Sequence, residues 1–165
     1  MKYIRLTQGK FAKVDDEDFV WLNKYKWCAV KMRRNYYATR KVKVDKNWKI
    51  LYMHILIIQK YWGLFIGRGK LSDHIDGNGL NNVKTNLRLC DYSQNAANQG
   101  AFIYPKSSKF KGVCWYKREK KWTARINKKG KRKHLGYYDD EIEAAQAYNE
   151  AAQKAFGDFA RLNTF

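Results

Sequence analysis

The residues best suited to chemistry lie between positions 71 and 98, around an adjacent aspartate and histidine. Asp73 and His74 are followed by a loop rich in glycine and asparagine, and then by Asn86 and Asn95. The imidazole of a histidine has a pKa near neutral, so His74 could accept a proton from water. Carboxylate and amide oxygens suit Mg²⁺, which takes one or two protein carboxylates and keeps several waters. The pattern therefore predicts a general base beside a metal ion that Asp73 and Asn95 hold.

Hydrolysis of a phosphodiester needs such groups together. The base activates the attacking water, and the cation neutralises charge on the phosphate and on the leaving oxygen. Each residue also has a simpler interpretation: a structural His74, a turn-capping Asp73, an Asx-turn at Asn86 and a solvent-facing helical side chain at Asn95. His54 is open between packing and a role in the site. The expected loop-forming residues are Asp76, Asn78, Asn81 and Asn82.

A strand, a loop, a second strand and a helix would have to position these side chains. Asp73 and His74 are expected at the end of one strand, and residues 86–90 are typical of the returning strand. Ser93 is expected to cap a short helix that carries Asn95. Neighbouring strand residues point to opposite faces, so Asp73 and His74 can share a site only if the strand breaks there.

The segment before residue 71 is rich in β signals and carries two helix signals. An apolar run from Met53 to about Gly63 predicts a helix. Residues 14–22 predict a shorter helix that begins with acidic side chains, which suit a helix N-terminus. The short strand-like runs are residues 36–39, 42–44 and 50–52, with turn chemistry at residues 45–47.

Several separated motifs of this first part resemble the HNH homing endonucleases of phages and bacteria. They are Asp73-His74, the run Asn86–Leu89, the run Ser93–Asn98, and the flanking segments 6–10 and 52–54, which recur in the family's order. The resemblance spans most of residues 3–99. It implies a ββα-metal (His-Me finger) nuclease fold and one catalytic Mg²⁺ or Mn²⁺ per active site.

The same resemblance implies roles for individual residues. His74 would be the general base, Asp73 and Asn95 the metal ligands, and Asn86 the residue that closes the loop and orients His74. The products would be a 5′-phosphate and a 3′-hydroxyl. The chain departs from the family at Ile55, where relatives usually have arginine, and at Ser72, where they usually have an apolar residue.

The charge of the chain points to a polyanionic partner. It has 34 Lys and Arg against 15 Asp and Glu, a formal net charge of +19. Nucleic acid is the first candidate and an anionic membrane surface the second. The most apolar run, residues 52–67, contains polar residues and is shorter than the roughly 20 residues that span a bilayer. The cysteines are odd in number and widely spaced, which favours reduced thiols over a disulfide framework or a zinc site: Cys28, Cys90 and Cys114.

The last third predicts a three-stranded sheet with one helix packed on its back. Residues 110–117, 121–127 and 131–138 are typical of strands, and a helix is expected from Asp139-Asp140 to Phe156, ended by Gly157. Residues 101–138 carry 13 basic side chains and one acidic one, whereas residues 139–165 carry 2 basic and 6 acidic ones. The sheet and the helix therefore have opposite charge.

Alternation along the three strands predicts which side chains leave the helix. Val113, Trp115 and Trp122 are expected in the core. A sheet can enter the major groove, where arginine reads guanine and asparagine reads adenine, while surrounding lysines neutralise phosphates. The predicted open face carries Tyr116, Arg125, Asn127, Arg132 and His134.

This module resembles the Apetala-two (ethylene-response-factor) DNA-binding domain over residues 108–163. The resemblance lies in residues 110–113, 122–126, 134–138, 143–149 and 159–163. It implies major-groove reading by the sheet, with Lys111, Arg125, Asn127, Arg132 and His134 as contacts. Cys114 stands where plant relatives often carry arginine, so the target sequence is not carried over.

Together these observations predict an α+β chain: a nuclease domain over 1–100 with its ββα-metal core at about 70–99, a linker at 101–107 and a DNA-binding domain over 108–165. The predicted function is a metal-dependent DNA endonuclease acting on double-stranded DNA. It is expected in the bacterial or phage-infected host cytoplasm, with no membrane and no obligatory protein partner. One alternative is a non-catalytic DNA-binding regulator that keeps the nuclease fold as a scaffold. An RNA-binding protein fits the charge but not a major-groove sheet, because A-form RNA hides that groove.

Overall fold

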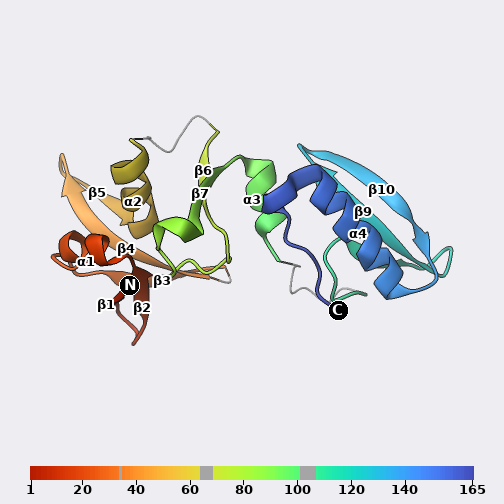
Figure 1. Ribbon diagram of the computed structural model, residues 1–165, viewed down its shortest axis with the longest axis horizontal. Coiled ribbons are helices and arrows are strands. Elements are labelled where there is room, and N and C mark those ends of the chain that lie inside the picture. The colour runs from red at the N-terminus through yellow and green to blue at the C-terminus, as the bar shows by residue number, and fades with distance from the viewer. Residues whose placement is uncertain (34, 64–68, 101–106) are drawn as a thin grey trace. The chain divides into compact units, whose positions relative to one another are not determined.

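The computed structural model describes residues 1–33, 35–63, 69–100 and 107–165. The chain divides into two compact units, Met1–Cys90 and Asp91–Phe165, each of which mixes helices with antiparallel sheets (Figure 1). This division lies before the boundary expected near residue 100. The predicted linker lies outside the described residues except for Ser107. Within the described residues, no helix has the length and apolar character needed to span a membrane.

The first unit contains three small antiparallel sheets and two α-helices. The sheets pair β1 with β2, β3 with β4 and β5, and β6 with β7. The elements are β1 (Lys2–Arg5), β2 (Phe11–Val14), α1 (Asp16–Leu22), β3 (Cys28–Met32), β4 (Asn35–Val44), β5 (Asn47–Tyr52), α2 (Met53–Trp62), β6 (Leu71–His74), the 3-10 turn η1 (Lys84–Asn86) and β7 (Leu87–Cys90).

One apolar core holds these elements together. Ile4, Val14 and Leu22 pack in it with Met53 and Ile57, all 1% exposed or less. Both predicted helices are present, and Gly63 ends α2 in the left-handed conformation at φ 60°. Because α2 starts directly after β5, its first turn carries His54 into the buried side of the unit.

The β strands differ from the prediction in two ways. The runs at residues 36–39 and 42–44 belong to one ten-residue strand, β4, because Arg40 and Lys41 continue the ladder with β5. The hairpin of β1 and β2, and β3 beside β4, were not predicted as strands. The predicted turn is present, with Asp45 and Lys46 both at positive φ.

The second unit begins with a short helix and continues as a sheet backed by a long helix. The sheet order is β10, β9, β8, all antiparallel. The elements are α3 (Tyr92–Asn98), β8 (Val113–Tyr116), β9 (Lys121–Lys128), β10 (Lys131–Tyr138), α4 (Glu141–Phe156) and the 3-10 turn η2 (Gly157–Phe159).

The caps predicted for the long helix are present. The Asp140 side chain accepts hydrogen bonds from the backbone N–H groups of Ile142 and Glu143, and Gly157 follows the last turn at φ 53°. Small residues on the inner face, such as Ala144 and Ala145, are fully buried and let α4 lie close to the sheet.

Trp115 corrects the predicted core of this sheet. Val113 is buried, but the Trp115 side chain is 38% exposed and meets Trp122 edge to face with ring centroids 5.2 Å apart. Trp115 lies on β8, an edge strand, and the small core under α4 is built from Phe110, Val113 and alanines instead.

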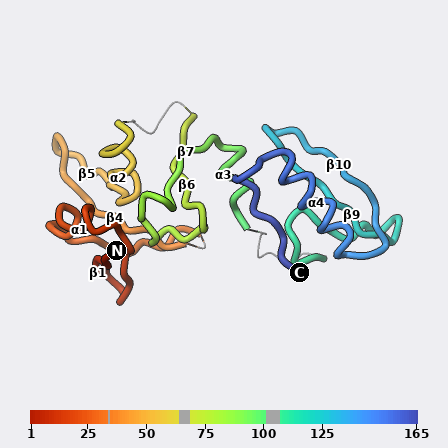
Figure 2. The backbone as a smooth tube through the Cα atoms, in the orientation of Figure 1, coloured from red at the N-terminus to blue at the C-terminus, as the bar shows by residue number. Residues whose placement is uncertain are grey.

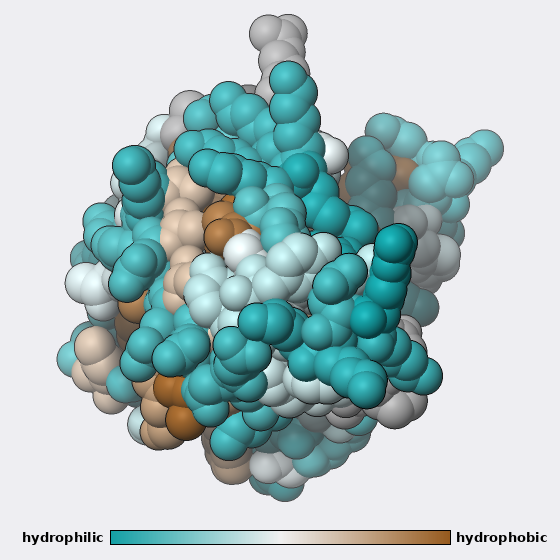
Figure 3. All heavy atoms as spheres, turned by 90° about the vertical axis from the view of Figure 1, so that its right-hand side faces the viewer, coloured by the Kyte–Doolittle hydropathy of each residue, from teal (hydrophilic) through white to brown (hydrophobic). Residues whose placement is uncertain are grey.

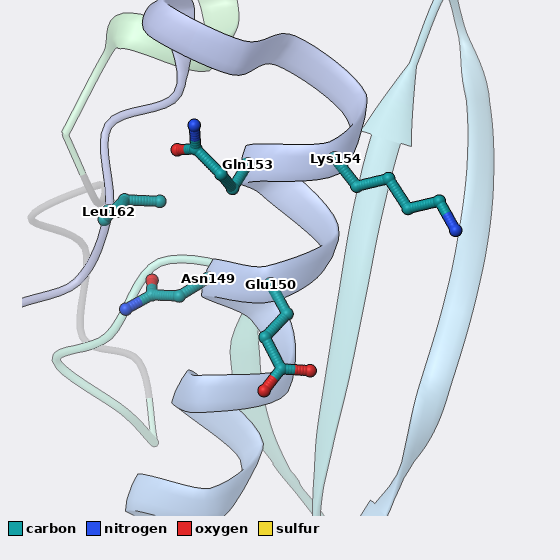
Figure 4. A pocket seen from close by; sticks show the side chains of 5 residues that line it. All are labelled: Asn149, Glu150, Gln153, Lys154 and Leu162. Atoms are coloured by element: carbon teal, nitrogen blue, oxygen red, sulfur yellow. The ribbon is translucent and has the colours of Figure 1, made fainter.

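A shallow hollow lies on the other side of α4, facing the C-terminal segment (Figure 4). Gln153, Asn149 and Leu162 line it together with Glu150 and Lys154. Asn149 and Asn163 exchange two hydrogen bonds, which hold the C-terminal segment beside the helix. The hollow therefore contains none of the candidate site residues.

Candidate active site and nucleic-acid interface

His74 ends β6 and is buried, with a ring whose orientation is set by Asn82. His74 Nε2 lies 3.1 Å from Asn82 Oδ1. Asn82 Nδ2 in turn donates to the sulfur of Met53 and to the Leu80 carbonyl, both acceptors, so the amide oxygen must face the histidine. An amide oxygen accepts, and His74 therefore carries its proton on Nε2 and its lone pair on Nδ1.

The surroundings of His74 keep it neutral. Burial lowers the pKa of His74 below its usual value, while the hydrogen bond to Asn82 and the charges of Asp76 and Asp73 act in the opposite direction. A neutral imidazole with a lone pair is the form that a general base needs at neutral pH. The described geometry thus presents His74 in the protonation state required for the predicted role.

Two aromatic side chains form a wall beside His74. The His54 and His74 rings are 4.8 Å apart between centroids and nearly perpendicular, and Tyr37 lies 6.0 Å from His74. Burial, then the charge of His74, lowers the pKa of His54 to about 3. His54 Nδ1 is buried without a hydrogen-bond partner among the described residues. His54 therefore packs as a neutral ring against His74, which settles its position but assigns it no chemistry.

Asp73 is also buried, and it is ion-paired with the residue opposite on β7. The guanidinium of Arg88 contacts Asp73 Oδ2 through Nε at 3.0 Å and Nη2 at 2.9 Å. Asp73 faces Arg88 in the ladder, and His74 faces Leu87. The two neighbours therefore lie on opposite faces of the hairpin, as alternation requires, and the strand ends only after His74.

Asn86 closes the loop that follows His74. Its Oδ1 accepts from the Asp76 backbone N–H at 3.0 Å, and its Nδ2 donates to Asp76 Oδ1 and to the Asn81 carbonyl. The Asn86 carbonyl accepts from the Ile75 N–H. Asn86 thus makes the loop-closing contacts of an Asx-type clasp, and its predicted influence on His74 acts through the backbone of Ile75.

Loop formation also involves the other polar residues of the loop. Asp76 accepts hydrogen bonds from Asn78 and Asn81, as expected for loop-forming residues. Burial would raise the pKa of Asp76, but these hydrogen bonds together lower it. Gly79 must be glycine, because an added Cβ would lie 2.5 Å from the Tyr36 carbonyl and 2.7 Å from the Tyr37 ring. The loop is therefore pressed against β4.

The donor types fit a hard divalent cation in part. Asp73 offers a carboxylate whose Oδ2 already holds Arg88, so an ion would bind through Oδ1. Asn95 lies on α3, in the second unit, and is half-buried. No group of three or more His, Cys, Asp or Glu side chains that could hold a metal occurs in the described ranges. A site here would depend on few protein ligands and on water, as Mg²⁺ permits.

The start of α3 differs from the prediction. Asp91, not Ser93, caps the helix: its side chain accepts from the Gln94 N–H, and Gln94 Oε1 accepts from the Asp91 N–H. Ser93 Oγ instead accepts from the backbone N–H of Lys129, in the turn between β9 and β10. Ser93 thus ties α3 to the sheet of the second unit.

The open face of the second sheet carries the predicted polar residues. Arg132 pairs with Asn127, and His134 with Arg125, as direct cross-strand neighbours, so these four side chains share one face. Asn127, Arg132 and His134 are exposed, and Arg125 is partly exposed. Hydrophilic side chains cover most of the face of the second unit seen in Figure 3.

An aromatic strip runs beside these polar residues. Tyr116 stacks on Tyr137 with centroids 5.5 Å apart, and His134 lies 4.5 Å from Tyr137. His134 Nε2 is 2.9 Å from Thr123 Oγ1. The β-bulge between His134 and Gly136 permits this contact, because it shifts the register of β10 by one residue. Tyr137 was not among the predicted contacts.

Lys111 has a different position from the one expected for a DNA contact. Its Nζ donates to the carbonyls of Ala96, Ala97 and Gln99, at 2.5–3.2 Å. Burial lowers the pKa of Lys111 to about 8, and the Arg161 charge acts in the same direction. The ammonium therefore caps the C-terminal end of α3, where carbonyls lack helical partners.

Three functional candidates escaped the sequence analysis. Asn82 was taken as a loop-former although it orients His74, and Tyr37 and Arg88 were not considered. The alternation of β7 could have indicated Arg88, because it places Arg88 opposite Asp73 once the hairpin register is known. No local signal distinguishes Asn82 from its neighbour Asn81.

Comparison with known proteins adds the family context. The AP2 domain model matches residues 108–158. An uncharacterized HNH endonuclease of Acanthamoeba polyphaga mimivirus is 32% identical over 162 residues, which cover 94% of this chain and 76% of that protein. Protein 3.8 of Escherichia phage T7 is 35% identical over 99 residues, 59% of this chain and 78% of that protein. An AP2-like ethylene-responsive transcription factor of Arabidopsis thaliana is 41% identical over 58 residues, 35% of this chain and 12% of that protein.

Proposed function

The chain belongs to the HNH endonuclease family and carries an AP2 domain at its C-terminal end, and from this premise we propose that it is a metal-dependent endonuclease of double-stranded DNA. The observation that carries the proposal is the buried, neutral His74, whose proton is held on Nε2 by Asn82. The AP2 domain supplies the second half of the proposal, placement on DNA through the open sheet face.

The proposed reaction uses His74 Nδ1 as the base. It takes a proton from water, the water oxygen bonds to phosphorus, and the bond from phosphorus to the 3′ oxygen breaks. The products are a 5′-phosphate and a 3′-hydroxyl. Asn82 and the Asn86 clasp act as positioning residues, because one sets the histidine ring and the other fixes the loop beyond it.

We keep Asp73 and Asn95 as the proposed ligands of one Mg²⁺ or Mn²⁺. A bound ion would supply charge neutralisation at the phosphate and at the leaving oxygen. Buried Asp73 has the oxygen chemistry for this, and Arg88 restrains its carboxylate. The Arg88 guanidinium also brings a positive charge to the same carboxylate, which can pair with a phosphate.

One observation favours the alternative of a DNA-binding regulator without catalysis. The charge of Asp73 is already matched by Arg88 at 2.9 Å, and an ion pair of this kind reduces the attraction of a carboxylate for a cation. The two proposals share the DNA-binding surface and differ only in turnover.

Chelation separates the two proposals. Supercoiled plasmid incubated with the full chain and Mg²⁺ should become open-circular or linear, EDTA should stop the conversion, and added Mg²⁺ should restore it. Gel electrophoresis of the plasmid measures the products. Intact plasmid under all conditions, with duplex binding retained, would support the regulator, and cutting in EDTA would contradict the single-ion scheme.

The AP2 sheet should read its site through Arg125. Replacing Arg125 by alanine is expected to weaken binding at the preferred site by about 1–3 kcal/mol, because a bidentate base contact is lost. The control is Lys117→Ala, which removes an exposed charge near the same sheet. Electrophoretic mobility shifts with preferred and random duplexes measure both variants. Equal weakening on the two duplexes would make Arg125 a phosphate contact.

A further inference from the structure

The hairpin of β4 and β5 carries exposed apolar side chains that no part of the described core covers. In the first unit the two strands run side by side to the turn at Asp45 and Lys46 (Figure 2). Trp48 is 68% exposed and Ile50 is 53% exposed. Tryptophan is highly buried on average in folded proteins, so a side chain this exposed indicates a contact surface.

One face of this hairpin combines the apolar side chains with lysines. Lys41 is directly opposite Ile50, and Lys43 is directly opposite Trp48. Directly opposite residues share a face, as do residues two apart on one strand. We call the face formed by Lys41, Lys43, Trp48 and Ile50 the ribbon face. Lys49 is opposite Val42 and lies on the other face.

The ribbon face continues toward the candidate active site. The ladder of β4 has no register shift between Asn35 and Val44, so Tyr37 and Thr39 lie on the same face as Lys41 and Lys43. Tyr37 is the residue whose ring lies 6.0 Å from His74. A partner lying along the ribbon face would therefore run toward the wall of the His74 site, within the first unit.

The charge of the hairpin identifies the partner. Between Asn35 and Tyr52, Asp45 is the only carboxylate. In the described part of the chain, no carboxylate pairs with the hairpin's cations, which are Arg40, Lys41, Lys43, Lys46 and Lys49. Close like charges repel unless an anion lies between them. A polyanion with apolar edges is the chemistry that fits.

We propose that the ribbon face is a second contact with duplex DNA, separate from the AP2 sheet. Lys41 and Lys43 bind backbone phosphates, and Trp48 and Ile50 contact apolar base edges such as the thymine methyl group. A two-stranded ribbon fits a major groove, which is about 12 Å wide. The inference rests on the proposed function for the identity of the partner, and it adds a binding surface carried by the nuclease unit itself.

Salt-dependent binding tests this surface. The full chain is used with His74→Ala, so that DNA stays intact, and duplex binding is followed by fluorescence anisotropy between about 50 and 200 mM salt. Each lost phosphate contact lowers the slope of log K against log salt by about 0.9. Lys43→Ala should lower the slope by about this amount, whereas Lys49→Ala, on the opposite face of the same hairpin, should leave it unchanged. Trp48→Ala should weaken binding roughly tenfold with the slope unchanged.

Several results would overturn the inference. One is a wild-type slope for both Lys43→Ala and Lys41→Ala. Another is normal duplex binding by the double variant combined with lost binding to phosphatidylserine vesicles, which would reassign the ribbon face to a membrane surface. The proposed nuclease is judged separately by plasmid cutting. A chain that cuts plasmid while every slope stays unchanged refutes only the ribbon contact, and a chain that shows the slope change without cutting refutes only the nuclease.

Discussion

Replacing His74 by alanine is expected to slow plasmid cleavage on the order of 10²–10⁴-fold, the usual contribution of a positioned general base. Binding of duplex DNA should change little, because His74 is 6% exposed and lies in the first unit away from the predicted contacts of the AP2 sheet. Single-turnover cleavage at saturating protein measures the rate, and anisotropy measures binding. Cleavage at the wild-type rate would remove His74 from the mechanism.

The matched control for this variant is His134→Ala. It removes an imidazole from the second unit, where His134 contacts Thr123 and Tyr137 on the open sheet face. This variant should weaken binding yet leave the cleavage rate at saturation unchanged. Thermal melting of both variants should resemble that of the wild type, which separates loss of the base from loss of the fold.

Gly112→Ala is expected to unfold the second unit or to destabilise it by about 4 kcal/mol or more, beyond the range of ordinary substitutions. The methyl group would overlap the ring of Tyr148 and lie 2.8 Å from the Arg125 carbonyl oxygen. Tyr148 is 5% exposed and packed in the core, and the Gly112 carbonyl accepts from the Arg125 N–H, so neither neighbour can move aside. Urea denaturation followed by tryptophan fluorescence and circular dichroism measures the loss.

Gly130→Ala isolates the backbone part of this effect. Gly130 has the same φ of 77° as Gly112, but no atom lies within 4 Å of the added methyl. The strain of placing alanine in this conformation is about 1–2 kcal/mol, so Gly130→Ala should cost only that amount. Equal destabilisation by both substitutions would show that backbone conformation, and not the packing of Tyr148, requires glycine at residue 112.

The second unit was the more predictable part of the fold, for local reasons. Asp140 and Gly157 are strong cap residues at the two ends of α4, and the strands β9 and β10 alternate clearly between polar and apolar side chains. Trp115 was the exception, because alternation gives the face of a strand but not whether the helix extends far enough to cover an edge. The AP2 domain itself is confirmed.

The candidate site was predictable in its residues and not in its contacts. The loop after His74 and the clasp at Asn86 follow from local turn chemistry, which short polar side chains determine. The partners Asn82, Tyr37 and Arg88 depend on which strand lies opposite and on how the loop packs on β4. Lys111 illustrates the same limit, because a lysine in a basic segment gives no sign that three carbonyls will surround its ammonium.

The Lys111 clasp on α3 has a consequence for building chimeras of this chain. A reader module excised at residue 107 as an interchangeable cassette would carry Lys111 away from Ala96, Ala97 and Gln99, and would also separate Lys129 from Ser93. The helix bearing Asn95 would then lose its C-terminal cap and its tie to the sheet turn. Swaps of target preference should therefore be spliced between Cys90 and Asp91, so that α3 travels with the module that holds it.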